Sequence, residues 1–229
     1  MTTLPPNLRY ERKFIADGLA LAEVLVIVRR HRAAFREAYP ARSLNTLYLD
    51  SPDLRNYNDH VNGVAHRTKT RVRWYGAWSG RIETPTLEHK LKHGQLSGKV
   101  SHRLPALSIN GHLPRNDLEA AFDGANLPAL GRSALRHLQP SLLNRYQRHY
   151  FQSADGRFRL TVDSGLQFAP ALQVHSTGVS FWPSATPVVI EVKYGLAEAE
   201  AASTVTNALP FRLVRCSKYV LGINSLAAS

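Results

Sequence analysis

Hydrophobic and charged residues alternate along several short segments of the chain, and this alternation predicts β-strands. Residues 188–194 are the clearest case, because Val188, Ile190 and Val192 fall on one face and Glu191 and Lys193 fall on the other. β-Branched residues dominate this segment, which favours a strand over a helix. A single strand of this kind is ordinarily half buried with its charges in water.

Four other segments repeat this arrangement, and in each of them cations outnumber carboxylates on the charged face. They are residues 9–14 with Arg9, Glu11 and Lys13, residues 70–75 with Arg71 and Arg73, residues 87–92 with Glu88, Lys90 and Lys92, and residues 157–163 with Arg157, Arg159 and Asp163. Solvated sheet faces would explain any one of them, but five with a common pattern favour a shared interior. We predict that the charged faces line the lumen of one curled sheet that encloses a polyanion.

Four segments of the chain are expected to be helical. The first helix is expected from Asp17 to about Tyr39, with an apolar stripe at Leu21–Val28, and Pro40 is expected to end it. Residues 114–138 are a second helical segment, which we interpret as an insertion between strands because it is too short for a core of its own. An alanine-rich helix is expected over 196–208 and a last helix after Ser217.

Turn residues and glycines divide the remainder of the chain. Residues 78–80 and 154–156 predict turns between antiparallel strands. Residues 93–102 are basic and contain two glycines, which indicates a mobile loop near a mouth of the lumen. One further strand is expected at 172–175.

Composition narrows the class of partner. The chain has 229 residues, with 29 lysines and arginines against 17 acidic residues, a formal net charge of +12. This length fits one all-β domain, and the excess of positive charge favours nucleic acid, a phosphorylated metabolite or a membrane surface. The cations are spread along strands rather than gathered in a tail, which argues against a disordered nucleic-acid-binding arm.

Cysteine and hydropathy patterns indicate the compartment. Cys216 is the single cysteine, so no internal disulfide forms and a reducing cytoplasm is the expected location. The N-terminal residues lack the pattern of a signal peptide, and no apolar stretch is long enough to span a bilayer. We therefore expect a soluble cytoplasmic protein without a membrane segment.

A lumen lined with cations requires counter-charge, because unpaired buried charges are very unfavourable. Glu11, Glu88, Asp163 and Glu191 supply part of it, and a chain of phosphates would supply the rest, since arginine binds phosphate oxygens bidentately. Each carboxylate either pairs with a cation or holds a divalent metal. We expect Glu191 to be the metal ligand, with the other three as further candidates.

Other chemistries have little support in the sequence. The chain has no phosphate-binding loop of the GxxxxGK[ST] type, no zinc-binding pattern and no nucleophile elbow.

Seven short motifs in order resemble the VTC domain, the catalytic domain of polyphosphate polymerases among the triphosphate tunnel metalloenzymes, whose relatives include the CYTH phosphatases. They are YERKF at 10–14, TRVRWYG at 70–76, LEHK at 87–90, RYQR at 145–148, RLTVD at 159–163, EVK at 191–193 and SKY at 217–219. Each motif is weak alone, but their order is specific. The resemblance covers the chain from about Arg9 to Gly222.

The resemblance implies an α+β, β-rich fold in which an eight-stranded antiparallel closed β-barrel forms a tunnel with helices packed outside, as one domain over 1–229. It also implies transfer of the γ-phosphate of ATP onto a polyphosphate chain, assisted by Mn²⁺ or Mg²⁺. ATP and inorganic polyphosphate or triphosphate are the expected partners, and nucleic acid is not expected.

By motif match, seven cations are expected to bind phosphate and serve catalysis: Lys13, Arg71, Arg73, Lys90, Arg148, Arg159 and Lys218. Lys92 and Lys193 are added as substrate-binding residues, and Glu191 matches the metal ligand.

One departure from the relatives bears on the reaction. The CYTH relatives begin with Glu-x-Glu-x-Lys, whereas Arg9 stands in place of the first glutamate, which argues against a two-metal hydrolase. Two alternatives stay open: hydrolysis of triphosphate or polyphosphate in the same tunnel, and a non-catalytic module that binds polyphosphate or nucleic acid. Glu191 argues against the second, since a pore that only binds phosphates has little use for a carboxylate.

Overall fold

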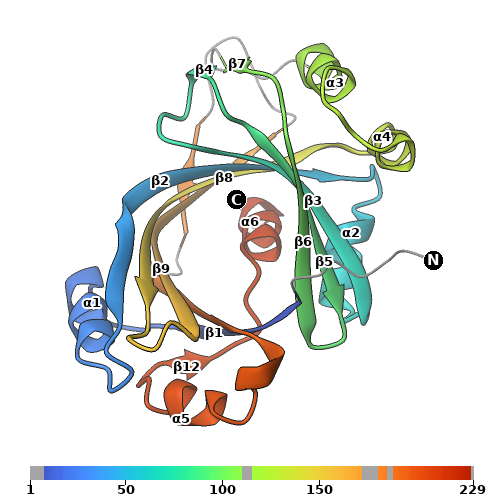
Figure 1. Ribbon diagram of the computed structural model, residues 1–229. Helices are drawn as coiled ribbons and strands as arrows, with labels where there is room; N and C mark the ends of the chain where they lie inside the picture. The colour runs from blue at the N-terminus through green and yellow to red at the C-terminus, as the bar shows by residue number, and fades with distance from the viewer. Residues whose placement is uncertain (1–7, 110–114, 172–179, 185–187, 228–229) are drawn as a thin grey trace.

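The computed structural model describes residues 8–109, 115–171, 180–184 and 188–227, and the fold is α+β (Figure 1). The strands are β1 Arg9–Ile15, β2 Arg36–Asp50, β3 His66–Tyr75, β4 Gly80–Ile82, β5 Thr86–His93, β6 Leu96–Arg103, β7 Leu107–Ile109, β8 Gln139–Gln152, β9 Phe158–Pro170, β10 Trp182–Pro183, β11 Val188–Tyr194 and β12 Arg212–Leu213. The helices are α1 Leu21–Arg29, α2 Arg55–Val61, α3 Arg115–Asp123, α4 Ala129–Leu135, the 3₁₀-helix η1 Leu196–Glu198, α5 Ala202–Thr206 and α6 Lys218–Ala227.

Eight of the strands close into a ring. Their order is β9-β11-β1-β6-β5-β3-β2-β8, and β8 pairs back with β9. Neighbouring strands of the ring are antiparallel throughout. The predicted ring of eight antiparallel strands is confirmed, and we call the space inside it the lumen.

Strand register brings the charged positions to one face. Lys13 is opposite Glu191 between β1 and β11, and Arg71 is opposite Glu88 between β3 and β5. Residues that face each other across an antiparallel pair point to the same side of the sheet, and alternate residues share a face. The charged faces predicted on β1, β3, β5 and β11 therefore turn toward the lumen. Of the charged positions expected at 157–163, Asp163 does so as well, whereas Arg157 lies before β9 and pairs with Asp155 and Glu198.

Helices cover the outer, apolar face of the ring at two places. On one side, Val24 of α1 and Val205 of α5 belong to a cluster with Ile190 of β11. On the other side, Phe122 of α3 packs in a cluster that includes Val72 of β3. These helices hold the ring in shape without entering the lumen.

Helix α6 lies differently, within the outline of the ring in Figure 1. Its Tyr219 packs in a third apolar cluster, whose members on β8 and β9 include Leu142 and Phe168. A Cβ atom built on Gly222 would lie 2.4 Å from Leu142 Cδ2 and 2.6 Å from Phe168 Cδ1. Because the apolar residues of this cluster continue the inward-facing rows of β2 and β8, α6 closes one end of the lumen.

A bulge in β9 makes this arrangement possible. The β8–β9 register shifts between Arg145 and Gln147, and Gly165 has φ +60°. Glycine adopts this left-handed conformation without strain, and the additional residue reverses the alternation of the strand. Asp163 before the bulge and Leu166 after it thus face the same side, and the charged layer passes directly into the apolar layer under α6.

Two predictions near the N-terminal half were wrong. The helix expected from Asp17 to Tyr39 ends at Arg29, and β2 begins at Arg36. β2 pairs with β8 along most of its length, so strand pairing outweighs local helical spacing, and Pro40 lies at an irregular part of that pairing. Residues 96–103 form β6 rather than a mobile loop, because Gly94 with φ +57° allows a tight turn from β5.

Other elements match the predictions in part. β3 and β5 pair as predicted, although their connection is longer than a hairpin turn and contains β4. Helices α3 and α4 lie within the helical segment expected at 114–138, and the helix expected over 196–208 is divided into η1 and α5. The strand predicted at 172–175 lies outside the described residues. Over the described ranges, no helix is long and apolar enough to cross a membrane.

Candidate active site in the lumen

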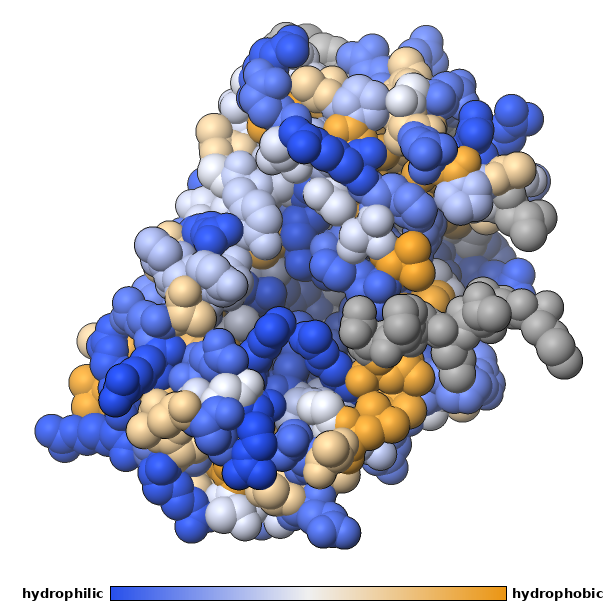
Figure 2. All heavy atoms as spheres, in the orientation of Figure 1, coloured by the Kyte–Doolittle hydropathy of each residue, from blue (hydrophilic) through white to orange (hydrophobic). Residues whose placement is uncertain are grey.

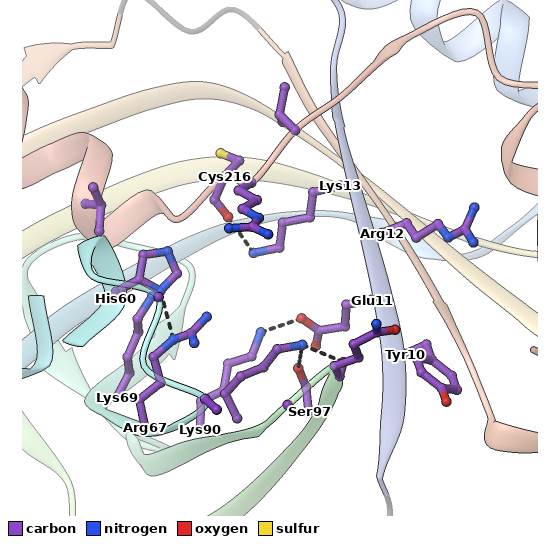
Figure 3. Close-up of a pocket in the computed structure, with 18 of the residues that line it drawn as sticks. Tyr10, Glu11, Arg12, Lys13, His60, Arg67, Lys69, Lys90, Ser97 and Cys216 are labelled. Carbon is purple, nitrogen blue, oxygen red and sulfur yellow. Dashed lines mark hydrogen bonds and ion pairs between the residues drawn. The ribbon is translucent and has the colours of Figure 1, made fainter.

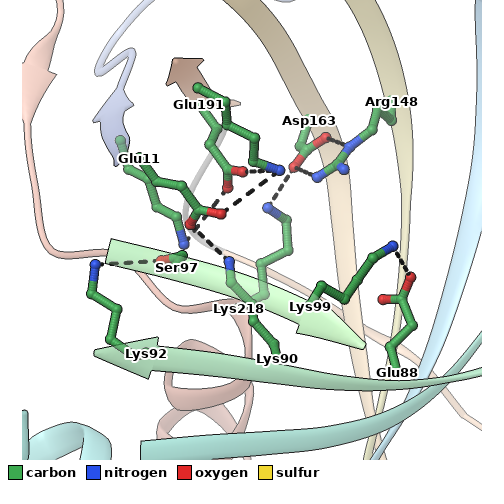
Figure 4. A network of polar contacts seen from close by, with 12 residues as sticks. Glu11, Glu88, Lys90, Lys92, Ser97, Lys99, Arg148, Asp163, Glu191 and Lys218 are labelled. Carbon is green, nitrogen blue, oxygen red and sulfur yellow. Dashed lines mark hydrogen bonds and ion pairs between the residues drawn. The ribbon is translucent and has the colours of Figure 1, made fainter. Parts of the chain in front are cut away.

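Charged side chains from seven strands and α6 meet in the lumen, and Figure 4 shows part of this network. The cations are Lys13, Lys69, Arg71, Arg73, Lys90, Lys99, Arg148, Lys193 and Lys218, and the carboxylates are Glu11, Glu88, Asp163 and Glu191. Nine basic side chains therefore stand against four carboxylates in this set, and positive charge stays in excess even with Lys69 neutral. Such an excess in a closed sheet produces a strongly positive potential that favours a polyanion.

Glu88 holds two arginines and a lysine in place. Arg71 approaches it through Nη2 at 2.7 Å and Arg73 through Nη1 at 3.4 Å, while Lys99 lies 2.6 Å away. Burial alone would raise the pKa of Glu88, but Arg71, Arg73 and Lys99 outweigh burial and hold this pKa far below its ordinary value. Glu88 thus stays ionised and orients two guanidinium groups beside the lumen.

Glu11 and Glu191 share a group of lysines on the opposite wall. Lys193 Nζ lies 2.5 Å from Glu191 Oε1 and 3.9 Å from Glu11 Oε1, so the two carboxylates lie close together. Lys90 Nζ is 2.8 Å from Glu11, and Lys13 Nζ is 3.7 Å from Glu191. Burial opposes ionisation of both carboxyls, but the surrounding lysines outweigh burial and lower both pKa values.

Asp163 anchors the third set of cations. Arg148 binds it with two hydrogen bonds, at 2.6 and 2.7 Å, and Lys218 of α6 lies 2.5 Å from the same carboxylate. Burial would raise the pKa of Asp163, yet Arg148 and Lys218 lower it to about 2. The Tyr146 ring contacts both cations, with its centroid 5.3 Å from Arg148 and 4.8 Å from Lys218.

A cavity of about 870 Å³ opens beside this network, lined by residues of β1, β3, β5, α2 and α6 (Figure 3). Figure 2 shows a hollow with hydrophilic walls on the face viewed along the ring. Within the described part of the chain, Lys69 donates to Ser217 Oγ at 2.6 Å and pairs with no carboxylate. Burial, followed by the charges of Lys13 and Lys90, lowers the pKa of Lys69 to about 6.

The same crowding affects neighbouring groups. Burial, which the charge of Glu11 offsets only in part, lowers the pKa of Lys90 to about 8. Burial and then Lys69 lower the pKa of His60, which accepts a hydrogen bond from Arg67, to about 3. Positive charge at this mouth is therefore already in excess before any ligand binds.

Several buried polar atoms around the lumen have no hydrogen-bond partner. They include Thr46 Oγ1, Arg73 Nε, Asn144 Oδ1 and Thr161 Oγ1, and all four residues occupy inward-facing positions by register. Buried polar atoms in folded proteins are nearly always paired with protein or water. Unpaired atoms here fit a lumen that receives a polar ligand.

Most of the residues predicted from the sequence lie together in the lumen. Lys92 lies at the cavity mouth and donates to the Gln95 carbonyl oxygen. Arg159 is opposite Lys193 in register but is exposed at the rim, beyond the ion-pair networks.

Three lumen residues were missed by the sequence interpretation. Lys69 precedes Arg71 by two positions, so strand alternation could have identified it. Lys99 was overlooked because its segment was interpreted as a loop. Tyr146 precedes Arg148 by two positions, so strand alternation could have placed it on the same face, whereas no signal in the sequence indicates its contact with Lys218 of α6.

Glu11 and Glu191 fit a divalent metal shared with phosphate. Hard cations such as Mg²⁺ bind one or two carboxylates together with phosphate oxygens and water. Both carboxylates approach one point, near Lys193, and hold low pKa values. Clusters of three or more metal-binding side chains do not occur within the described part of the chain, so phosphate oxygens would have to complete the coordination.

The chain was compared with known proteins. A search of the curated proteins found no significant match. Three solved structures resemble the fold over nearly all of both chains. The first is a protein of Pyrococcus horikoshii, with 12% sequence identity and a TM-score of 0.50 over 95% of this chain and 98% of that chain. The second is a proposed adenylate cyclase of Vibrio parahaemolyticus, with 10% identity and a TM-score of 0.53 over 95% of this chain and 99% of that chain. The third is a proposed adenylyl cyclase of Hippeastrum with a dominant triphosphatase activity, with 10% identity and a TM-score of 0.52 over 96% of each chain.

At these identities the structural matches establish the fold alone. The family assignment comes from the sequence, because the model of the VTC domain matches residues 8–227. That range includes all eight strands of the ring and helix α6. The chain therefore belongs to the VTC domain family.

Proposed function

We propose that this protein is a polyphosphate polymerase that transfers the γ-phosphate of ATP onto a polyphosphate chain inside the lumen. The excess of cations over carboxylates within a closed ring carries this proposal. Membership of the VTC family supports it, and the triphosphatase activity of the Hippeastrum protein agrees with a triphosphate ligand in this fold.

Binding and orientation would come from the cations on both walls. Arg71 and Arg73, held by Glu88, present guanidinium groups that can bind phosphate oxygens bidentately. Lys13 of β1 faces them across the lumen, and Lys90 lies beside them on β5. Phosphoryl transfer depends mainly on positioning and on neutralising the charge spread over the phosphate oxygens, which these residues do together.

The pKa pattern favours transfer to phosphate over transfer to water. Attack by water benefits from a general base, whereas the end of a polyphosphate chain is already ionised near neutral pH. The four lumen carboxylates have lowered pKa values and are therefore weak bases. Lys69 is neutral in the free protein, but a bound polyanion raises its pKa and removes it as a base.

Glu191, with Glu11 beside it, would hold Mn²⁺ or Mg²⁺ against the phosphates. When bound, the metal would polarise phosphate oxygens and neutralise charge during transfer. Lys193 and Lys13 position the Glu191 carboxylate for this role.

The test is to incubate the purified protein with ATP and Mn²⁺ and to separate the products. Polymerisation yields ADP and long-chain polyphosphate, which a gel stained for polyphosphate detects. ADP with free phosphate alone would identify a hydrolase. Stabilisation by tripolyphosphate without any turnover would identify a binding module. The Arg73→Ala variant is the control, because it should lose whichever activity the parent has.

A further inference from the structure

Three tyrosines and one arginine form a cluster at a rim of the lumen. The Arg42 guanidinium carbon lies 5.3 Å from the ring centroid of Tyr39, 5.4 Å from that of Tyr75 and 5.6 Å from that of Tyr150. Tyr39 and Tyr150 meet edge to face, with centroids 5.9 Å apart. We call these four residues the aromatic rim.

Strand register places the aromatic rim directly beyond the cations of the lumen. Arg42 is opposite Arg148, and Tyr39 is opposite Tyr150, between β2 and β8. Tyr150 follows Arg148 by two residues, so it shares the inward face at a step of about 7 Å along the strand. Tyr75 follows Arg73 in the same way on β3.

The fold does not require these tyrosines for its core. Tyr39 is 58% exposed and Tyr75 is 47% exposed, and neither belongs to the three apolar clusters. Exposed aromatic rings close to a cationic site have open faces that a planar group can cover. Stacking on aromatic side chains and on arginine is the general way in which proteins bind nucleobases without reading their sequence.

We propose that the aromatic rim stacks against the base of a nucleoside triphosphate whose phosphates lie among the lumen cations. This inference rests on the proposed function, since it assumes that phosphates bind in the lumen. One step along a strand is comparable to the span of the ribose that separates a base from its first phosphate. Inorganic triphosphate has no group for the rim, so the rim gives the protein a preference for a nucleotide donor.

The experiment measures the affinities of ATP and of inorganic tripolyphosphate by isothermal titration calorimetry without metal. The proteins are the parent, Tyr39→Ala, Tyr75→Ala and the conservative variants Tyr39→Phe and Tyr75→Phe. The control is Tyr10→Ala, since Tyr10 is a tyrosine outside the aromatic rim that lines the cavity, stacks on Tyr194 and packs against the apolar cluster under α1 and α5.

We expect each rim alanine variant to bind ATP about 5- to 100-fold more weakly than the parent, as for loss of base stacking. Tripolyphosphate affinity should change by less than about twofold, and the phenylalanine variants should bind ATP as the parent does. Equal weakening of both ligands would overturn the inference, because the rim would then act through phosphate or through folding. Unchanged ATP affinity in the rim alanine variants would also overturn the inference, as would a loss of ATP affinity seen in Tyr10→Ala alone. If the parent binds neither ligand, the proposed function fails as well.

Discussion

Lys69 should couple triphosphate binding to proton uptake. In the free protein its pKa is about 6, so at pH 8 the side chain is mostly neutral. A bound polyanion supplies the negative charge that the site lacks and returns the pKa toward or above the ordinary 10.5. Binding of tripolyphosphate at pH 8 should therefore take up about one proton through Lys69.

The sign of the pH dependence follows from this shift. Binding raises the pKa of Lys69, so the bound state holds more protons than the free state above pH ~6, and affinity falls as the pH rises. The slope contributed by one proton is at most about tenfold per pH unit. Lys90, with a pKa of about 8, contributes up to about half a proton at pH 8 in every variant that retains it.

The assay is calorimetry of tripolyphosphate binding at pH 8 with a chelator, in two buffers with different ionisation enthalpies. The parent and Lys69→Met should differ by about one proton taken up. Lys99→Met is the matched control: it removes a lumen cation that pairs with Glu88 and leaves Lys69 in place, so affinity should fall while proton uptake remains. Equal proton uptake by the parent and Lys69→Met would refute the reasoning.

Three other substitutions test separate parts of the structure. Glu191→Gln should lower Mn²⁺-dependent ATP turnover by about 100-fold or more while tripolyphosphate affinity holds or rises; parental turnover would contradict the metal-ligand role. Arg73→Ala should weaken tripolyphosphate binding by roughly 10- to 150-fold in calorimetry, since it removes a charge-assisted contact of about 1.5–3 kcal/mol. Gly222→Ala should lower the melting temperature by roughly 2–10 °C, because its Cβ would overlap buried carbon atoms. Gly131→Ala, where a Cβ would lie 4.0 Å from Pro128 Cδ, should keep or raise the melting temperature, and a rise in both variants would contradict the tight packing of α6.

Strand alternation was enough to predict the charged lumen. Arg71, Arg73, Glu88 and Lys90 repeat with period two, and side chains at this period must share a face of the sheet. Ring closure then brings such faces together. The same alternation identified the lumen carboxylates. It could not identify their cationic partners, because the register between strands that are distant in sequence cannot be inferred from the pattern of a single strand.

Local pattern failed where long-range pairing decides the structure. Residues 30–39 contain helix-forming residues, yet Arg36 begins β2 because β8 offers a long partner strand. The role of α6 was also missed. Its apolar residues predict a buried helix, but only the inward turn of Leu166 and Phe168 after Gly165 creates an apolar end to the lumen.

The ring of strands is joined by few residue pairs between β1 and β6, so it should open most readily at this junction. These strands meet over two residue pairs among the described residues, Arg9 with Ser97 and Tyr10 with Leu96, whereas β2 and β8 pair along most of their length. Local opening follows the least-bonded segments, so amide hydrogens along the first half of β1 should exchange before those of β2 or β8. The ion pair between Glu11 of β1 and Lys90 of β5 crosses this junction. A polyanion that binds Lys13 and Lys90 together would therefore hold the ring closed while it is bound and would release it on dissociation.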